Sequence, residues 1–241
     1  MEKRKDSSIR EVISTNQEFY HLIQKDIQEM VASEKEKIQQ RRFVLPLAYP
    51  DFQDLFIWFG NYCLSQRNQN TSFVIDEDNK PIIEQLYCFV TNNPSFSGDL
   101  SKGIMLQGKY GCGKTLILET YSLLHNYVVR KFSLSHPLFT FIKSVELQQQ
   151  IISQSVSMFV RRPLIIDEFG REPKTIMDYG NVMRPISELL SLRSDVGVLT
   201  HGTTNFTLAT LSSEEFYGRM IGDRLKVMFN FITLKGESRR V

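Results

Sequence analysis

The sequence predicts an α/β fold in which helices flank a largely parallel β-sheet, preceded by a mainly helical amino-terminal region. Three observations predict it. Short apolar segments alternate with helical segments from Gly103 onward, a pattern typical of a parallel sheet covered on both faces. A glycine-rich loop joins the first of these strands to the helix after it. Before about residue 70, apolar residues recur at helical spacing instead.

Composition narrows the class of protein. The 241 residues are 41% hydrophobic and 23% charged, which is normal for one globular domain with an appendage or for two domains. The net charge of +2 excludes a globally basic surface. Three isolated cysteines and four scattered histidines lack metal-ligand spacing. No segment reads as a signal peptide or membrane span. We therefore expect a reduced, cytoplasmic protein without membrane association.

Two helices are expected in the amino-terminal region, residues 1–70. The first runs from about Val12 to Ile38, and one of its faces carries Tyr20, Ile23, Ile27, Met30 and Val31. That face fits a coiled-coil or partner helix and fits docking on the rest of the chain equally well. A second helix begins after Pro50, with Asp51 as its cap, and is rich in aromatic residues around Trp58. Core packing is favoured for it over a partner-binding patch.

The second domain, residues 71–241, should begin with a short strand at Thr71–Ile75 and a helix at Pro81–Val90. The sheet that follows is predicted from the strands Ile104–Gln107, Leu138–Ile142, Leu164–Asp167, Val196–Thr200 and Val227–Leu234. Its helices are predicted at Lys114–Tyr127, Val145–Ser157, Val182–Leu192 and Leu208–Phe216.

A phosphate-binding loop follows the first of these strands. It matches the pattern G-x-x-x-x-G-K-[ST] and consists of Gly108, Lys109, Tyr110, Gly111, Cys112, Gly113, Lys114 and Thr115. The glycines let consecutive backbone N–H groups point at an anion, and the next helix adds its dipole. Lys114 would reach the β- and γ-phosphates of ATP, and Thr115 would bind Mg²⁺. Cys112 is interpreted as a spacer first; the sharper hypothesis is that alkylation of Cys112 blocks nucleotide binding.

Two acids end the apolar strand that begins near Leu164. Asp167 would hold the Mg²⁺ that Thr115 also contacts, and Glu168 would polarise the attacking water as a general base. The pair indicates hydrolysis and argues against a P-loop kinase, which must keep water away from the γ-phosphate.

Further candidates lie downstream. The apolar run before Asn205 ends in polar residues, so Asn205 or Thr204 could contact the γ-phosphate or the water, whereas His201 is expected to be structural. Arg219 and Arg224 follow a predicted helix. Either could be an arginine finger that acts across a subunit boundary or a residue of ordinary surface salt bridges.

Taken together, these motifs resemble the DnaC/IstB branch of AAA+ ATPases, which includes helicase loaders and transposition helper proteins. The resemblance runs from about Leu100 to the end of the chain and rests on the P-loop, Ile165-Ile-Asp-Glu-Phe-Gly-Arg-Glu-Pro173, Tyr179-Gly180, Thr203-Thr-Asn205, Tyr217-Gly218, Asp223-Arg-Leu225 and Leu234-Lys-Gly-Glu-Ser-Arg-Arg240. It implies an AAA+ P-loop NTPase fold without a carboxy-terminal lid domain. It also implies Asn205 as sensor I and Arg224, with Arg219 second, as the finger of a ring or helical homo-oligomer.

The resemblance implies partners as well. A loader would deliver a replicative DNA helicase onto single-stranded DNA, with the Tyr20–Val31 face and the Trp58 helix as candidate helicase contacts. Lys143 with the helix after it, Lys131 and Arg130 are the candidate DNA contacts. Two alternatives stay open: an IstB-like helper that acts on duplex DNA with a transposase, and a nucleotide-switched binding module with little turnover.

Overall fold

The computed structural model describes residues 16–40, 42–67, 71–178 and 181–239, which form two compact units, Met1–Val44 and Leu45–Val241. The described part of the first unit contains helix α2 (Asn16–Gln40), which confirms the first predicted helix from Asn16 onward, whereas its predicted start at Val12 lies outside the described residues. The side chains of its predicted apolar face, from Tyr20 to Val31, are exposed. None of the described helices is both long enough and apolar enough to span a membrane.

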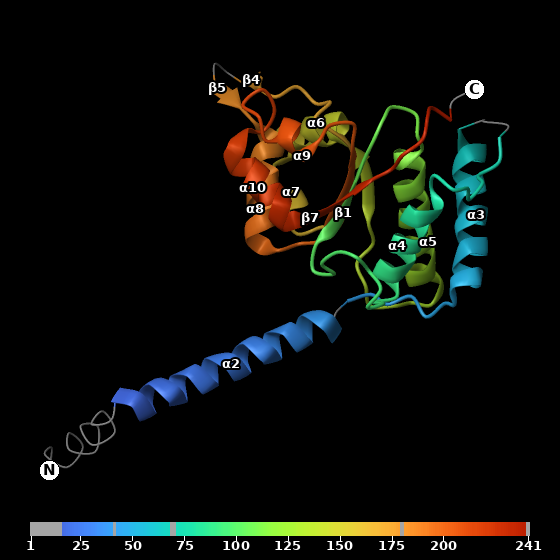
Figure 1. The fold of residues 1–241 in the computed structure, drawn as a ribbon. Coiled ribbons are helices and arrows are strands. Elements are labelled where there is room, and N and C mark those ends of the chain that lie inside the picture. The colour runs from blue at the N-terminus through green and yellow to red at the C-terminus, as the bar shows by residue number, and fades with distance from the viewer. Residues whose placement is uncertain (1–15, 41, 68–70, 179–180, 240–241) are drawn as a thin grey trace, which may run out of the picture. The chain divides into compact units, whose positions relative to one another are not determined.

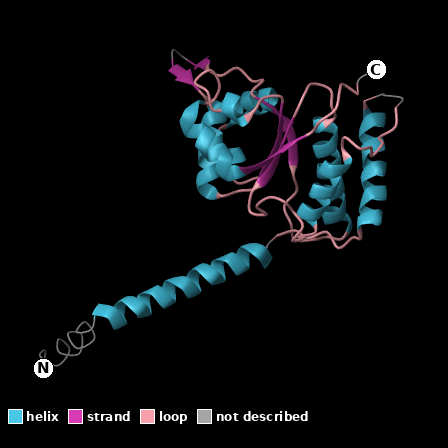
Figure 2. Cartoon of the chain, viewed as in Figure 1, coloured by secondary structure: helices cyan, strands magenta, loops and turns pink. Residues whose placement is uncertain are grey.

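The second unit is built on a sheet of five parallel strands in the order β2-β3-β6-β1-β7. The strands are β1 (Gly103–Gln107), β2 (Thr140–Lys143), β3 (Leu164–Phe169), β6 (Thr200–Thr204) and β7 (Phe229–Thr233). Figure 2 shows these strands between two groups of helices. Because β6 lies between β3 and β1 and the strands are parallel, the segments that follow these three strands meet at one edge of the sheet.

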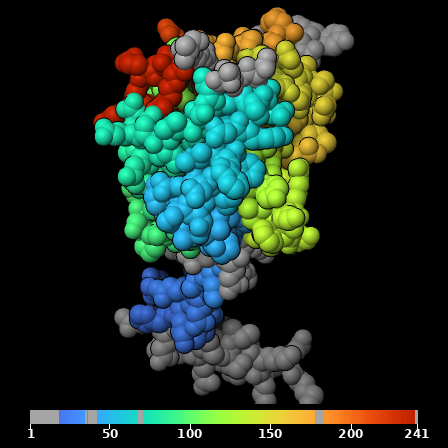
Figure 3. All heavy atoms as spheres, turned by 90° about the vertical axis from the view of Figure 1, so that its right-hand side faces the viewer, coloured from blue at the N-terminus to red at the C-terminus, as the bar shows by residue number. Residues whose placement is uncertain are grey.

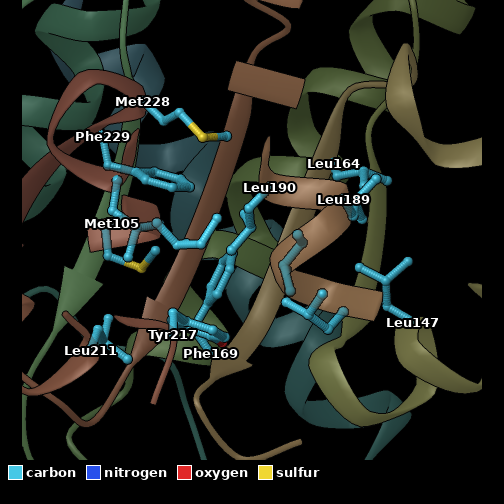
Figure 4. Close-up of a cluster of buried hydrophobic side chains, with 14 of the residues drawn as sticks. Met105, Leu147, Leu164, Phe169, Leu189, Leu190, Leu211, Tyr217, Met228 and Phe229 are labelled. Carbon is cyan, nitrogen blue, oxygen red and sulfur yellow. The ribbon is translucent and has the colours of Figure 1, made fainter. Parts of the chain in front are cut away.

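Helices cover both faces of the sheet (Figure 1). On one side lie α3 (Tyr49–Gln66), α4 (Lys80–Val90) and α5 (Lys114–Lys131). On the other side lie α6 (Ser144–Gln154), α7 (Ser157–Val160), α8 (Pro185–Val196), α9 (Leu208–Leu211) and α10 (Gly218–Met228). A buried apolar cluster joins the sheet to this second group; in Figure 4, Phe169 and Tyr217 lie together in it, near Leu211.

Helix α3 belongs to the sheet-containing unit, so the compact division at Val44 comes earlier than the expected boundary at residue 70. The reason is that α3 packs against α5: the Phe59 and Tyr127 rings are 5.5 Å apart, and Cys63 contacts Thr120. Core packing of α3 is confirmed by Phe56, which is fully buried, whereas Trp58 is 72% exposed. Asp51 lies in the first turn but does not cap the helix, because Ala48 holds the cap position.

Several predicted elements were wrong. Residues 71–76 form no strand, because side chains satisfy their backbone: Asn61 accepts from the Phe73 amide, and Asn79 donates to the Val74 carbonyl. The strand predicted at Val196–Thr200 starts only at Thr200, since α8 runs on to a left-handed Gly197 cap. The last predicted helix ends at Leu211 and is followed by α10, which was not predicted. A two-stranded hairpin, β4 (Ile176–Asp178) and β5 (Asn181–Met183), replaces the start of the helix predicted from Val182.

Candidate active site

A cleft of about 650 Å³ lies at the carboxyl edge of the sheet. The loop after β1, the start of α5, Glu168 from β3 and the end of β6 line it, together with residues 71–74 and Arg239. Ligands bind at this edge in open parallel sheets. The P-loop and the acidic pair predicted from the sequence are therefore brought together at this edge.

The P-loop backbone has the conformation that its glycines permit. Gly111 and Gly113 have φ angles of +80° and +107°, which side chains rarely adopt. Lys114 is 6% exposed, and its Nζ donates to the carbonyls of Gly108 (2.8 Å) and Lys109 (2.6 Å). Burial lowers the pKa of Lys114. An ammonium group at the mouth of a glycine-rich loop fits a phosphate chain, whose oxygens would replace these carbonyls as acceptors.

The two side chains between the first two glycines are exposed, and that of Tyr110 lines the cleft. Lys109 pairs with Glu237, and Tyr110 is 62% exposed. Cys112 is fully buried, and its thiol donates to the Lys109 carbonyl. Cys112 therefore acts as a packed spacer in this structure, and its alkylation would require the loop to open.

Asp167 is the centre of a buried polar cluster. Its Oδ1 accepts hydrogen bonds from the hydroxyls of Thr115 (2.8 Å) and Thr203 (2.6 Å). Burial raises the pKa of Asp167, and these two hydrogen bonds act in the opposite direction. A threonine hydroxyl and one carboxylate fit Mg²⁺, which takes few protein ligands and completes its shell with water and phosphate oxygens. The described residues contain no cluster of three or more acidic, histidine or cysteine ligands.

A β-bulge sets the direction of Glu168. Between Ile166 and Phe169, β3 has one residue more than β6 opposite it, and Glu168 has a φ angle of +62°. Its amide donates to Thr203 Oγ1 (2.9 Å), and its carbonyl accepts from Ser144 (2.8 Å). Successive residues of a regular strand point to opposite faces. The bulge instead lets Asp167 contact Thr115 while Glu168 lines the cleft.

Asn205 lies in the site and Thr204 does not. Asn205 Oδ1 accepts from Lys114 Nζ (2.8 Å). Thr204 instead donates to the Phe169 carbonyl and is fully buried. His201 is structural, as expected: its Nδ1 accepts from the Ile104 amide within an aromatic cluster. Of the two candidate sensors, the geometry favours Asn205.

Neither candidate finger lies in this cleft. Both Arg219 and Arg224 are on α10, on the other side of the sheet from α5 (Figure 1). Arg224 pairs with Asp195 and donates to the Ser191 carbonyl at 3.0 Å, whereas Arg219 is exposed. Arg219 and Arg224 therefore do not reach the cleft of their own chain. A role for either in the cleft of a second copy is a proposal.

The candidate DNA contacts do not form one patch. Lys143 ends β2 beside Asp167, at the edge of the sheet that carries the cleft. Arg130 and Lys131 end α5, which begins at the P-loop. With 1.5 Å of rise per residue, Arg130 lies about 24 Å from Lys114 along the helix axis. Lys143 thus lies at the edge of the sheet where α5 begins, whereas Arg130 and Lys131 lie at the far end of α5.

Sequence reasoning missed Thr203 and Arg239. Thr203 binds Asp167 and the amide of Glu168, and Arg239 lines the cleft from the carboxy-terminal tail. A signal for Thr203 was present, since it stands two residues before Asn205 at the end of a buried strand. Arg239 lies in the carboxy-terminal motif that contributes to the resemblance, but the motif alone assigned it no role, because its place in the cleft depends on how the tail folds back.

Comparisons with known proteins give the fold. No protein-family model matches the sequence, and no curated protein does. Solved structures do match. A candidate primosome component from Streptococcus pyogenes serotype M3 shares 17% identity over 84% of this chain and 97% of its own, with a TM-score of 0.52. The DnaC helicase loader shares 19% identity over 69% of this chain and 95% of its own, with a TM-score of 0.50.

The chain has a DnaC-like AAA+ fold. This confirms the fold class predicted from the sequence. At 17% and 19% identity, the similarity to these two structures concerns the fold alone. In this DnaC-like arrangement the P-loop follows β1, the acidic pair lies near the end of β3, and β6 lies between the two strands. The described residues after β7, up to Arg239, form no further helix.

Proposed function

We propose that this chain binds and hydrolyses ATP at the cleft between the P-loop, β3 and β6. The observation that carries the proposal is the convergence at Asp167. Hydroxyls from the P-loop helix and from β6 bind one buried carboxylate oxygen, and Glu168 lines the cleft beside it. A structural cluster would not need a second acid held there in a left-handed backbone conformation.

Each residue has a role in this proposal. Amide groups of the P-loop bind phosphate oxygens, and Lys114 neutralises part of their charge. Thr115 and Asp167 would hold Mg²⁺, which supplies charge neutralisation on the phosphate oxygens. Glu168 accepts a proton from the attacking water, and Asn205 orients the groups around Lys114. Thr203 fixes both acids at once.

Glu168 can act as the base only when its contact with Arg171 opens. Arg171 Nη1 donates to Glu168 Oε1 at 2.6 Å, and both side chains are partly exposed. In that geometry the carboxylate is turned toward a cation rather than toward a water. Hydrolysis should therefore be slow until the pair opens, and a switch with very low turnover is the outcome if it never opens.

We further propose that the ATPase is a helicase loader, because the motifs resemble the DnaC/IstB branch and the DnaC helicase loader shares the fold. In this proposal the exposed apolar face of α2 binds a replicative helicase. A homo-oligomer would bring Arg224 or Arg219 to the cleft of a second copy, and single-stranded DNA would be the substrate for loading.

The test is association of the full chain with the replicative helicase of the same cell, measured by light scattering with ATP, with ADP and without nucleotide. Stoichiometric binding in at least one state, lost when Ile23 and Ile27 are replaced by aspartate, supports the loader. The matched control replaces Lys25 and Glu29, an exposed pair on the same helix, with glutamine. Absence of binding in every state, together with capture of a transposase, would favour the IstB-like alternative.

A further inference from the structure

The tail after β7 crosses the P-loop and is fixed to it at both ends. We call Leu234–Arg239 the strap. The Leu234 amide donates to Gln107, directly before the loop, and the Arg239 amide donates to the Gly111 carbonyl at 3.0 Å. Between them Ser238 comes so close that a Cβ on Gly111 would lie 2.2 Å from its Oγ and 3.2 Å from its Cα. The strap therefore follows the contour of the phosphate-binding loop.

The side chain of Arg239 turns from the strap into the cleft. Its Cδ lies 3.6 Å from the position that a Cβ on Gly113 would take, and Arg239 is among the residues that line the cleft. Its guanidinium group donates to both oxygens of Asp76, at 2.5 and 2.8 Å, with Asp78 at 3.8 Å. In Figure 3 the red C-terminal residues lie beside the cyan-green residues after α3.

The position of the Arg239 guanidinium also suits a phosphate group. A planar guanidinium binds carboxylates and phosphates with the same two-pronged geometry. The P-loop backbone around Gly113 is the part that cradles the α- and β-phosphates in this motif. A phosphate chain in the loop would therefore lie beside Arg239 and compete with Asp76 for the same donors.

We propose that Arg239 binds the α- or β-phosphate of the nucleotide in its own subunit and exchanges Asp76 for it. The inference rests on the proposed function and adds to it a phosphate-binding residue from the strap. The exchange also links the site to the segment between α3 and α4. Asp76 Oδ1 accepts from the amides of Asp78 and Asn79, so this carboxylate shapes the turn before α4.

The test measures equilibrium binding of fluorescent ATP and ADP to the full chain, without reference to turnover. Arg239→Gln should weaken both nucleotides by roughly ten- to hundredfold, as expected for loss of a hydrogen bond to a charged group. Asp76→Asn should instead tighten both several-fold, because it removes the competing charge and keeps an acceptor for the turn. In the Arg239→Gln background Asp76→Asn should have no effect. The matched control is Lys235→Gln, an exposed cation of the same strap outside the cleft lining.

The outcomes separate the two proposals. If the wild-type chain binds and hydrolyses ATP but Arg239→Gln binds both nucleotides like wild type, the inference is overturned and the proposed function stands. A loss confined to ATP would overturn the assignment to the α- or β-phosphate. If the wild-type chain binds neither nucleotide, both proposals fail. Unfolding of a variant would only weaken nucleotide binding. It therefore cannot produce the expected combination of weaker binding by Arg239→Gln and tighter binding by Asp76→Asn.

Discussion

Thr203 is the residue on which the geometry of both acids depends. Its hydroxyl donates to Asp167 at 2.6 Å and accepts from the Glu168 amide at 2.9 Å, and the residue is 1% exposed. Thr203→Val keeps the shape and removes both hydrogen bonds. A buried carboxylate then loses one of its two hydroxyl donors, and a backbone N–H at the bulge loses its acceptor.

The magnitude follows from these two losses. A hydrogen bond to a charged group contributes about 1.5–3 kcal/mol, and a buried unsatisfied N–H is unfavourable by about 1–3 kcal/mol. Both losses come from one side chain and are not additive, so we expect the free energy of unfolding to fall by about 2–4 kcal/mol. Urea unfolding followed by circular dichroism measures it.

Thr203→Ser is the matched control, because it keeps the hydroxyl and removes only a methyl group, worth about 1 kcal/mol. ATP turnover should fall with the valine variant and be largely retained with serine. If valine is as stable as wild type, the hydroxyl does not hold the two acids, and the account of the bulge is refuted.

Three further predictions concern the charged groups of the site and of α10. Burial raises the pKa of Asp167 in the folded state, so the neutral carboxyl adds stability at low pH that is lost as the pH rises through that pKa. Without divalent cations, Asp167→Asn should therefore raise the free energy of unfolding at neutral pH, with a difference that disappears on acidification; a pH-independent difference would contradict this sign. Arg171→Ala should raise phosphate release several-fold at unchanged melting temperature, and a decrease would mean that Arg171 assists the chemistry. Arg224→Ala should leave ATP affinity unchanged while abolishing the rise of turnover with protein concentration; weaker ATP binding by the monomer would exclude a finger in trans.

The parts of the site that lie in continuous sequence could be predicted. The P-loop is a local device, since its glycines, Lys114 and Thr115 are adjacent in the chain. Asp167 and Glu168 were found because a buried parallel strand must end at the ligand-binding edge. The strand–helix alternation likewise predicted the sheet, apart from its exact boundaries.

The parts that depend on tertiary contacts could not be predicted. The left-handed backbone conformation of Glu168 results from a register shift between β3 and β6, and no residue type in the sequence predicts that shift. Arg239 reaches the cleft because the strap folds back over residues far away in sequence. The strand predicted at Thr71–Ile75 does not form: the β-branched and aromatic residues there suit a strand, but the side chains of Asn61 and Asn79 bind the backbone instead.

Hydrolysis of ATP by Glu168 is the central claim, and single-turnover kinetics of wild type and Glu168→Gln test it most directly. Glutamine keeps the size of the side chain and removes its basicity. The account predicts that the variant binds ATP with wild-type affinity and hydrolyses it at least a hundredfold more slowly, in line with the ~10²–10⁴-fold contribution of general-base catalysis. Equal rates of hydrolysis in the two proteins would contradict it.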